Sequence, residues 1–148
     1  MKKILNYIDG SLVPPKDKNY LDNINPSTGG IYSQYPDSTK DDINLAVQSS
    51  KTAFPSWSAL SVEKRAKYLC RIADKIDEKL IELAEAETID TGKPIYLSKE
   101  IDIPRAAANF RFFAGAVMNF HGESYQTINS IINYTSSTRS DDYQTSSI

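Results

Sequence analysis

Two arginines interrupt the apolar helical stretch DIPRAAANFRFFAG, residues 102–115, and they are the side chains of this sequence best placed to do chemistry. A guanidinium can bind a carboxylate through two parallel hydrogen bonds, a geometry that lysine cannot copy. Six helical residues place Arg105 and Arg111 about 120° apart around the axis. The two side chains therefore meet different surroundings, and each needs its own interpretation.

Arg111 lies between two phenylalanines in the sequence but belongs to neither apolar stripe of the helix, so we expect a solvated or surface-paired charge. Arg105 lies on the stripe that also carries Ile101, Ala108 and Phe112, where small walls and one permanent cation could form a groove for a carboxylate. Alternatively, its stem packs on Ile101 while the charged head reaches water. The spacing leaves both interpretations open.

No other residues make a catalytic or metal-binding set. The single histidine, His121, stands at the predicted end of a helix, where a capping or surface role is expected. The single cysteine, Cys70, stands next to the apolar stripe of an earlier helix, where a small buried thiol is expected. One histidine with one distant cysteine forms no metal cluster.

Composition restricts the class of protein further. The chain has 148 residues, 17 basic and 19 acidic side chains and a net charge of −2, so it lacks the basic excess typical of nucleic-acid binders. We find no apolar run long enough for a membrane span or for a secretory signal. The lone cysteine excludes an intrachain disulfide. A cytoplasmic location is the expectation.

The elements that position these residues divide the chain into three parts. Residues 1–36 predict strands and turns, with Asp9-Gly10 as one hairpin turn and 25–30 as a second between strands near 20–24 and 31–35. Residues 37–122 predict helices. Residues 123–148 contain the strand-like IINYT, residues 131–135, and end in a tail rich in serine and threonine, 135–148, which we expect to be disordered.

Three long helices are expected between residues 37 and 122. The first begins after the N-cap Thr39 and ends at Pro55, which lacks the N–H that the next turn needs. The second runs from Ser61 to about Ile89 on one apolar stripe and is stopped by Gly92 and then Pro94. The third begins at the N-cap Asp102, carries Pro104 in its first turn and reaches about Phe120.

Four segments in fixed order carry a family resemblance. NPSTGGIY, AFPSWSALSVEKRAKYL, EAETIDTGKP and DIPRAAANFRFFAGAVMNFHGE resemble the N-terminal part of aldehyde dehydrogenases, over about residues 6–135. The last segment further resembles the 2-hydroxymuconic and 2-aminomuconic semialdehyde dehydrogenases. The resemblance implies an α/β family and, for this chain, a partial aldehyde dehydrogenase fold: N-terminal hairpins followed by three long helices, without the Rossmann-type parallel sheet.

The resemblance also implies a chemistry and a few site residues. In the family a cysteine thiolate attacks the aldehyde, hydride passes to NAD or NADP, and a glutamate activates water. Those groups are expected downstream of residue 148, so we expect no catalytic residue in this chain and no cofactor bound by it alone. Arg105 matches the position expected to hold a substrate carboxylate, and Ile101 lines the same tunnel. Asp90 and the carbonyl of Ile24 match a structural monovalent-cation site.

After IINYT the sequence departs from the family pattern. SSTRSDDYQTSSI replaces the expected Pro-Gly-Val and Pro-Trp-Asn segments, which suggests a truncated or frameshifted reading frame or an incomplete gene model. Our main hypothesis is therefore a truncated, non-catalytic segment of an NAD(P)-dependent aldehyde dehydrogenase. The alternative is a small helical interaction module that pairs with a full-length dehydrogenase or another protein. A homo-oligomer or such a heteromer is conceivable; nucleic-acid and membrane partners are not expected.

Overall fold

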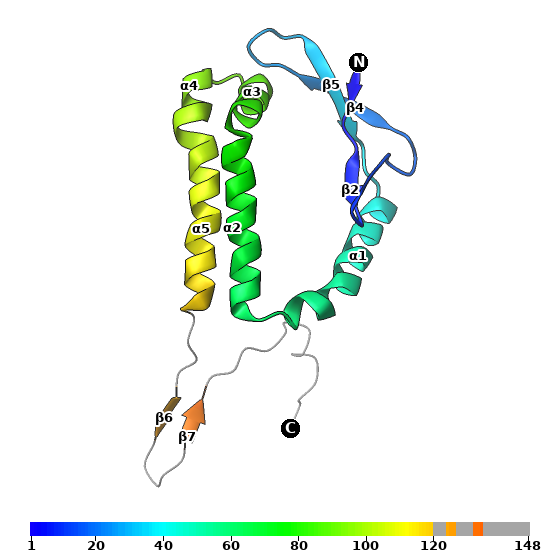
Figure 1. The fold of residues 1–148 in the computed structure, drawn as a ribbon. Helices are drawn as coiled ribbons and strands as arrows, with labels where there is room; N and C mark the ends of the chain where they lie inside the picture. The colour runs from blue at the N-terminus through cyan, green and yellow to red at the C-terminus, as the bar shows by residue number, and fades with distance from the viewer. Residues whose placement is uncertain (120–123, 127–131, 135–148) are drawn as a thin grey trace.

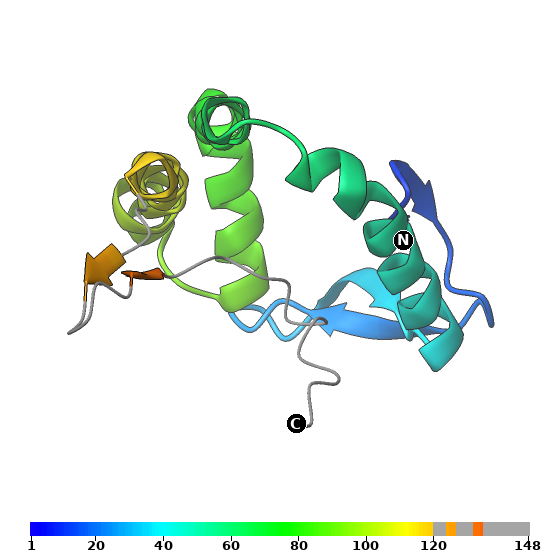
Figure 2. The same ribbon diagram turned by 90° about the horizontal axis from the view of Figure 1, so that it is seen from below.

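The computed structural model of the chain describes residues 1–119, 124–126 and 132–134. Five short strands and helix α1 (Lys40–Ser58) form one side of the molecule, and α2 (Val62–Glu78) packs antiparallel to α5 (Ile103–Met118) on the other (Figure 1). Seen from below, α1 lies against the strands, apart from the α2–α5 pair (Figure 2). Helix α3 (Leu80–Thr91) stands between the two sides.

The strands follow the two predicted hairpins. Strands β2 (Asn6–Ile8) and β3 (Ser11–Val13) pair antiparallel around Asp9 and Gly10, whose φ angles of 52° and 74° suit the tight turn that follows the twist of a hairpin. Strands β4 (Tyr20–Ile24) and β5 (Ile31–Pro36) pair antiparallel around the turn at 25–30. Strand β1 (Lys2–Lys3) adds to β5 in parallel, giving the order β1-β5-β4. Both predicted hairpins are confirmed.

Helix α1 begins where the sequence predicts but does not end there. Thr39 is the N-cap, and the buried Asp42 carboxylate accepts hydrogen bonds from the Thr39 backbone N–H at 2.8 Å and from the Lys16 N–H at 2.9 Å. The prediction that Pro55 ends the helix is wrong, because the helix continues to Ser58. The carbonyl of Pro55 accepts the N–H of Ala59, and the Trp57 ring, 5.5 Å from that of Tyr68, ties this last turn to α2.

The second predicted helix is in fact two. Ser61 is the N-cap of α2, but the chain leaves helical geometry at Lys79 (φ −104°, ψ 18°), and α3 begins at Leu80. Lys79 shares its N–H between the carbonyls of Lys75 and Ile76, an arrangement common at helix ends. No glycine or proline marks this break, and the apolar spacing of the sequence continues through it. No local signal therefore indicates that the helix ends here. The predicted stop at Gly92 is confirmed, with φ 75°.

The third helix begins earlier than the sequence predicts. Helices α4 (Ile95–Leu97), η1 (Ser98–Asp102, a π-helical turn) and α5 follow one another without a break. The prediction that Asp102 caps the helix is wrong, because Asp102 is itself helical and makes no capping hydrogen bond. The N–H of Ile103 donates to the carbonyl of Ser98, five residues back. Pro104 lies in the first turn of α5, as predicted, and the wide turn before it gives room for its ring.

The last described strands, β6 (Ser124–Gln126) and β7 (Ile132–Tyr134), pair antiparallel. The predicted tail at 135–148 and His121 lie outside the described residues. Within the described part, no helix combines the length and apolar character that crossing a bilayer requires.

Small side chains form the buried contact between helices. Among the described residues, the buried apolar side chains on the helices are all alanines, two on α2, one on α3 and two on α5: Ala66, Ala73, Ala84, Ala107 and Ala114. The seven-residue spacing within α2 and within α5 keeps each pair on one helix face. The larger apolar side chains lie elsewhere, and many of them are exposed, among them Phe112 at 68% and Phe113 at 60%.

Gly92 allows a test of how the strands dock on α3. A Cβ at Gly92 would stand 3.1 Å from Cβ of Pro26 and 3.2 Å from Oγ of Ser27, and the φ angle is already left-handed. We expect Gly92→Ala to lower the free energy of unfolding by about 1–2 kcal/mol. Urea unfolding followed by circular dichroism measures this.

Gly115 is the matched control. It lies inside α5, and a Cβ there would meet nothing within 4 Å. Gly115→Ala should therefore raise the free energy of unfolding by about 0.5–1 kcal/mol through helix propensity. Shifts of the same sign in both variants would contradict the left-handed, closely packed surroundings of Gly92.

Candidate functional site

The exposed face of α5 carries the first predicted site. It is the stripe that the sequence predicts around Arg105, which begins at Ile101 in the preceding π turn. All six of its residues are exposed: Ile101, Arg105, Ala108, Asn109, Phe112 and Ala116. Ile101 is 50% exposed. The structure thus places one guanidinium among small and apolar side chains on an open surface. Within the described residues, Arg105 makes no hydrogen bond, ion pair or ring contact.

Arg111 lies on a different face and is paired with two carboxylates. One of its guanidinium nitrogens, Nη2, lies 2.8 Å from Oδ1 of Asp74 and 2.7 Å from Oδ2 of Asp77, both on α2. These carboxylates raise the pKa of Arg111, Asp74 contributing more than Asp77. The predicted surface-paired charge is confirmed: two ion pairs from Nη2 of Arg111 fasten α5 to α2.

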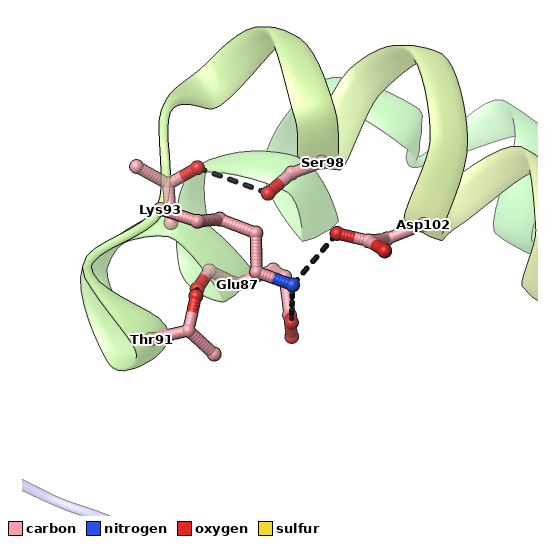
Figure 3. A network of polar contacts seen from close by, with 6 residues as sticks. Glu87, Thr91, Lys93, Ser98 and Asp102 are labelled. Atoms are coloured by element: carbon pink, nitrogen blue, oxygen red, sulfur yellow. Dashed lines mark hydrogen bonds and ion pairs between the residues drawn. The ribbon is translucent and has the colours of Figure 1, made fainter.

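A lysine that the sequence prediction did not single out holds the base of the Arg105 helix. Lys93 Nζ lies 2.7 Å from Oδ2 of Asp102 and 2.8 Å from Oε1 of Glu87 (Figure 3). The Lys93 side chain is 29% exposed, and hydrogen bonds to Asp102 and then Glu87 raise its pKa. The ion pairs join the end of α3 to the last residue of the π turn.

A second contact reaches the first residue of the same turn. The hydroxyls of Thr88 and Ser98 lie 3.1 Å apart, and Ser98 is completely buried. Because a buried hydroxyl needs a partner, this pair satisfies Ser98 and fixes its position against α3. Glu87 is in turn held in a well-formed last turn, since Thr91 Oγ1 donates to the Glu87 carbonyl at 2.7 Å.

The predicted cation ligands lie where α3 meets the strands. Oδ1 of Asp90 accepts hydrogen bonds from the Tyr32 hydroxyl at 2.7 Å and from Nδ2 of Asn23 at 3.1 Å. These two donors, Tyr32 first, lower the pKa of Asp90. Ile24 directly follows Asn23 at a register shift of the β4–β5 pair and is 52% exposed. The structure therefore brings β4 next to Asp90.

The described residues contain no cluster of three histidine, cysteine, aspartate or glutamate side chains suited to a metal. The expectation that Cys70 is buried is wrong: its side chain is exposed, while the adjacent Leu69 is half-buried. One helical residue rotates a side chain by about 100°, enough to carry it off the apolar stripe.

Sequence reasoning missed the residues that support the predicted site residues through hydrogen bonds and ion pairs. Lys93, Glu87 and Thr88 resemble ordinary surface positions, and the only available signal is the closeness of Lys93 to the helix-stopping Gly92. For Tyr32 and Asn23 the sequence indicates only that each lies in a strand. Their partner Asp90 lies 58 and 67 residues away in the sequence, so no local pattern could pair them.

Comparison with known proteins now connects this arrangement to a family. The model of the aldehyde dehydrogenase family matches residues 12–140. Over 121 residues the chain is 44% identical to the 2-aminomuconic semialdehyde dehydrogenase of Bos taurus, covering 82% of this chain and 24% of that protein. Over 135 residues it is 38% identical to the 5-carboxymethyl-2-hydroxymuconate semialdehyde dehydrogenase of Escherichia coli, covering 91% and 28%.

A solved structure agrees. The crystal structure of PnpE in complex with nicotinamide adenine dinucleotide superimposes with a TM-score of 0.83 at 36% sequence identity, covering 90% of this chain and 27% of PnpE. The chain thus spans about a quarter of the length of the relatives that it matches. Its strands and helices form a partial aldehyde dehydrogenase fold, as the sequence predicted, and resemble the N-terminal part of NAD-dependent members. By sequence and by fold, the chain belongs to the aldehyde dehydrogenase family.

Proposed function

We propose that the chain supplies the N-terminal strands and helices of an NAD(P)-dependent dehydrogenase whose substrate is an aldehyde carrying a carboxylate, and that Arg105 binds this carboxylate. The observation that carries the proposal is the contrast between the two arginines. Arg111 is ion-paired with two aspartates, whereas Arg105 is exposed and unpaired within the described residues. An unpaired guanidinium beside apolar walls suits an anionic, partly apolar ligand.

Ile101 has a complementary role in this proposal. It lies one helical turn from Arg105 and is half exposed, so it offers an apolar contact for the carbon chain that joins the carboxylate to the aldehyde. NAD or NADP would accept the hydride from the aldehyde carbon. The muconic semialdehyde dehydrogenases among the relatives are named for substrates that carry at least one carboxylate, which supports this substrate class.

The Arg105 assignment is tested in a chimaeric dehydrogenase, in which residues 12–140 of this chain replace the matching segment of the Escherichia coli relative. We expect Arg105→Ala to raise KM for 6-oxohexanoate by about 10- to 100-fold, because a hydrogen-bonded charge pair is lost. KM for hexanal, the neutral counterpart, should stay unchanged. NADH formation measures both.

Arg111→Ala is the matched control. It removes an arginine of the same helix that faces Asp74 and Asp77 instead of the proposed substrate face. It should lower thermal stability without changing the ratio of kcat/KM for the two aldehydes. Equal losses on both aldehydes in Arg105→Ala would remove the assignment.

The 148-residue chain by itself is proposed to be non-catalytic. Its one cysteine, Cys70, is exposed on α2 and has no hydrogen-bond partner within the described residues that could activate it. We expect no NADH formation from the purified chain with either aldehyde and NAD or NADP. Sustained turnover would refute this.

The exposed apolar side chains favour a second candidate, an interaction module. A surface carrying Phe112 and Phe113 at 68% and 60% exposure favours association. Size-exclusion chromatography with the full-length Escherichia coli relative distinguishes the candidates: a defined heteromer supports the module, whereas self-aggregation supports an isolated segment.

We also propose that Asp90 and the Ile24 carbonyl contribute oxygen ligands to a monovalent-cation site. The arrangement supports this because both donors to Asp90 use Oδ1, leaving Oδ2 without a hydrogen bond from the described residues. A bound cation competes with the proton, so the pKa of Asp90 should be lower in potassium chloride than in choline chloride at equal ionic strength. Equal values by NMR titration would exclude the site.

The lowered pKa of Asp90 predicts that the stability of the fold depends on pH. Because the pKa of Asp90 lies below its ordinary 3.8 in the folded chain, Asp90 stabilises the fold at pH above about 4, and this contribution is lost as pH falls through the folded-state pKa. The difference in unfolding free energy between the natural chain and Asp90→Asn should thus be constant near neutrality and shrink in acid. Tyr32→Phe should raise the Asp90 pKa towards 3.8.

A further inference from the structure

The π turn before α5 is held at both ends by α3. Its first residue, Ser98, bonds the Thr88 hydroxyl, and its last residue, Asp102, bonds Lys93, which also bonds Glu87 (Figure 3). The three anchoring residues, Glu87, Thr88 and Lys93, lie in or just after the last turn of α3. A short segment of rare geometry is therefore fixed at its two limits by one neighbouring helix.

This geometry determines what the exposed face presents. A π turn accommodates one extra residue, so its loss would rotate everything before it by about 100° relative to α5. Ile101 lies inside the turn, and Arg105 lies just after it. Their common exposure on one face thus depends on the turn keeping its shape.

Local sequence alone does not secure that shape. Pro104 cannot donate a backbone hydrogen bond, which weakens ordinary helical pairing just before it. The π turn has poorer intrinsic stability than an α-helical turn and persists where the surroundings determine it. The contacts from α3 are partly or fully shielded from solvent: Ser98 is completely buried, and the carboxylates of Glu87 and Asp102 are each 36% exposed.

We propose that Lys93, bridging Glu87 and Asp102, is a positioning residue that sets the distance and angle between Ile101 and Arg105 and so determines selectivity for carboxylated aldehydes. The inference rests on the proposed function, because it acts through Arg105. The Thr88–Ser98 pair is the second anchor of the same device. Neither anchor touches the substrate, so both act only by holding the turn.

Two variants of the chimaeric dehydrogenase remove the anchors without leaving unpaired buried groups. The first combines Lys93→Met with Glu87→Gln and Asp102→Asn, which deletes the charges at nearly constant shape. The second combines Thr88→Val with Ser98→Ala, which deletes both hydroxyls together. The control is Lys79→Met with Glu82→Gln, which removes an exposed ion pair of 2.8 Å at the other end of α3.

We expect each anchor variant to lower the ratio of kcat/KM for 6-oxohexanoate over hexanal by about tenfold, since a misplacement of about 1 Å can cost up to about 100-fold. The change should lie in KM for 6-oxohexanoate, while kcat for hexanal is kept. Amide hydrogen exchange of residues 98–103 should become faster in the same variants. Lys93→Arg alone can still bridge the two carboxylates, so it should keep the ratio of the unsubstituted chimaera.

The outcomes separate this inference from the proposed function. If Arg105→Ala changes the ratio but the anchor variants leave it as in the Lys79 control, or slow both aldehydes equally, the positioning role is refuted and the carboxylate-binding role stands. If Arg105→Ala itself leaves the ratio unchanged, the proposed function fails and the inference fails with it. Faster exchange with an unchanged ratio also refutes the positioning role.

Discussion

The C-terminal end of α3 is the point on which the rest of the described structure depends. The left-handed Gly92 turns the chain there and lets Pro26 and Ser27 pack so closely that a Cβ at residue 92 would lie 3.1 Å from Cβ of Pro26. Within six residues, this end bonds the strands through Asp90 and the π turn through Thr88 and Lys93. This short segment thus joins the strands to the helical side of the molecule, which also contacts the end of α1 through Trp57 and Tyr68.

This role of α3 explains why the break at Lys79 matters. A continuous helix of the predicted length would carry residues 87–93 straight beyond the end of α2, away from both the strands and the start of α5. The break redirects α3 across the end of the α2–α5 pair (Figure 1). The N–H that Lys79 shares between two carbonyls costs little, and the hydrogen bonds and ion pairs at the far end of α3 offset that cost.

The sequence predicted elements well and their connections poorly. Asp9-Gly10, Thr39 and Gly92 are local signals, since each residue type is needed by the backbone at that position, and each prediction holds. The predictions of a helix end at Pro55, of an unbroken helix through Lys79 and of an N-cap at Asp102 are wrong because tertiary contacts decide these positions. The ring of Trp57 contacts α2 and holds a helical turn beyond the proline. The carboxylate of Asp102 bonds Lys93 instead of capping a helix terminus. Arg111 was predictable as a paired charge, but its partners on α2 were not.

Charge pairing also accounts for the different availability of the two arginines. Asp74 and Asp77 stand three residues apart on α2, so both carboxylates face the same side and reach one guanidinium. Two acidic groups near the start of α5, Glu87 and Asp102, are instead paired with Lys93. Because both of these carboxylates already have a cation, neither is free to neutralise Arg105. Lys93 therefore acts twice in this arrangement: it fixes the π turn, and it keeps these two carboxylates from competing with an anionic ligand for Arg105.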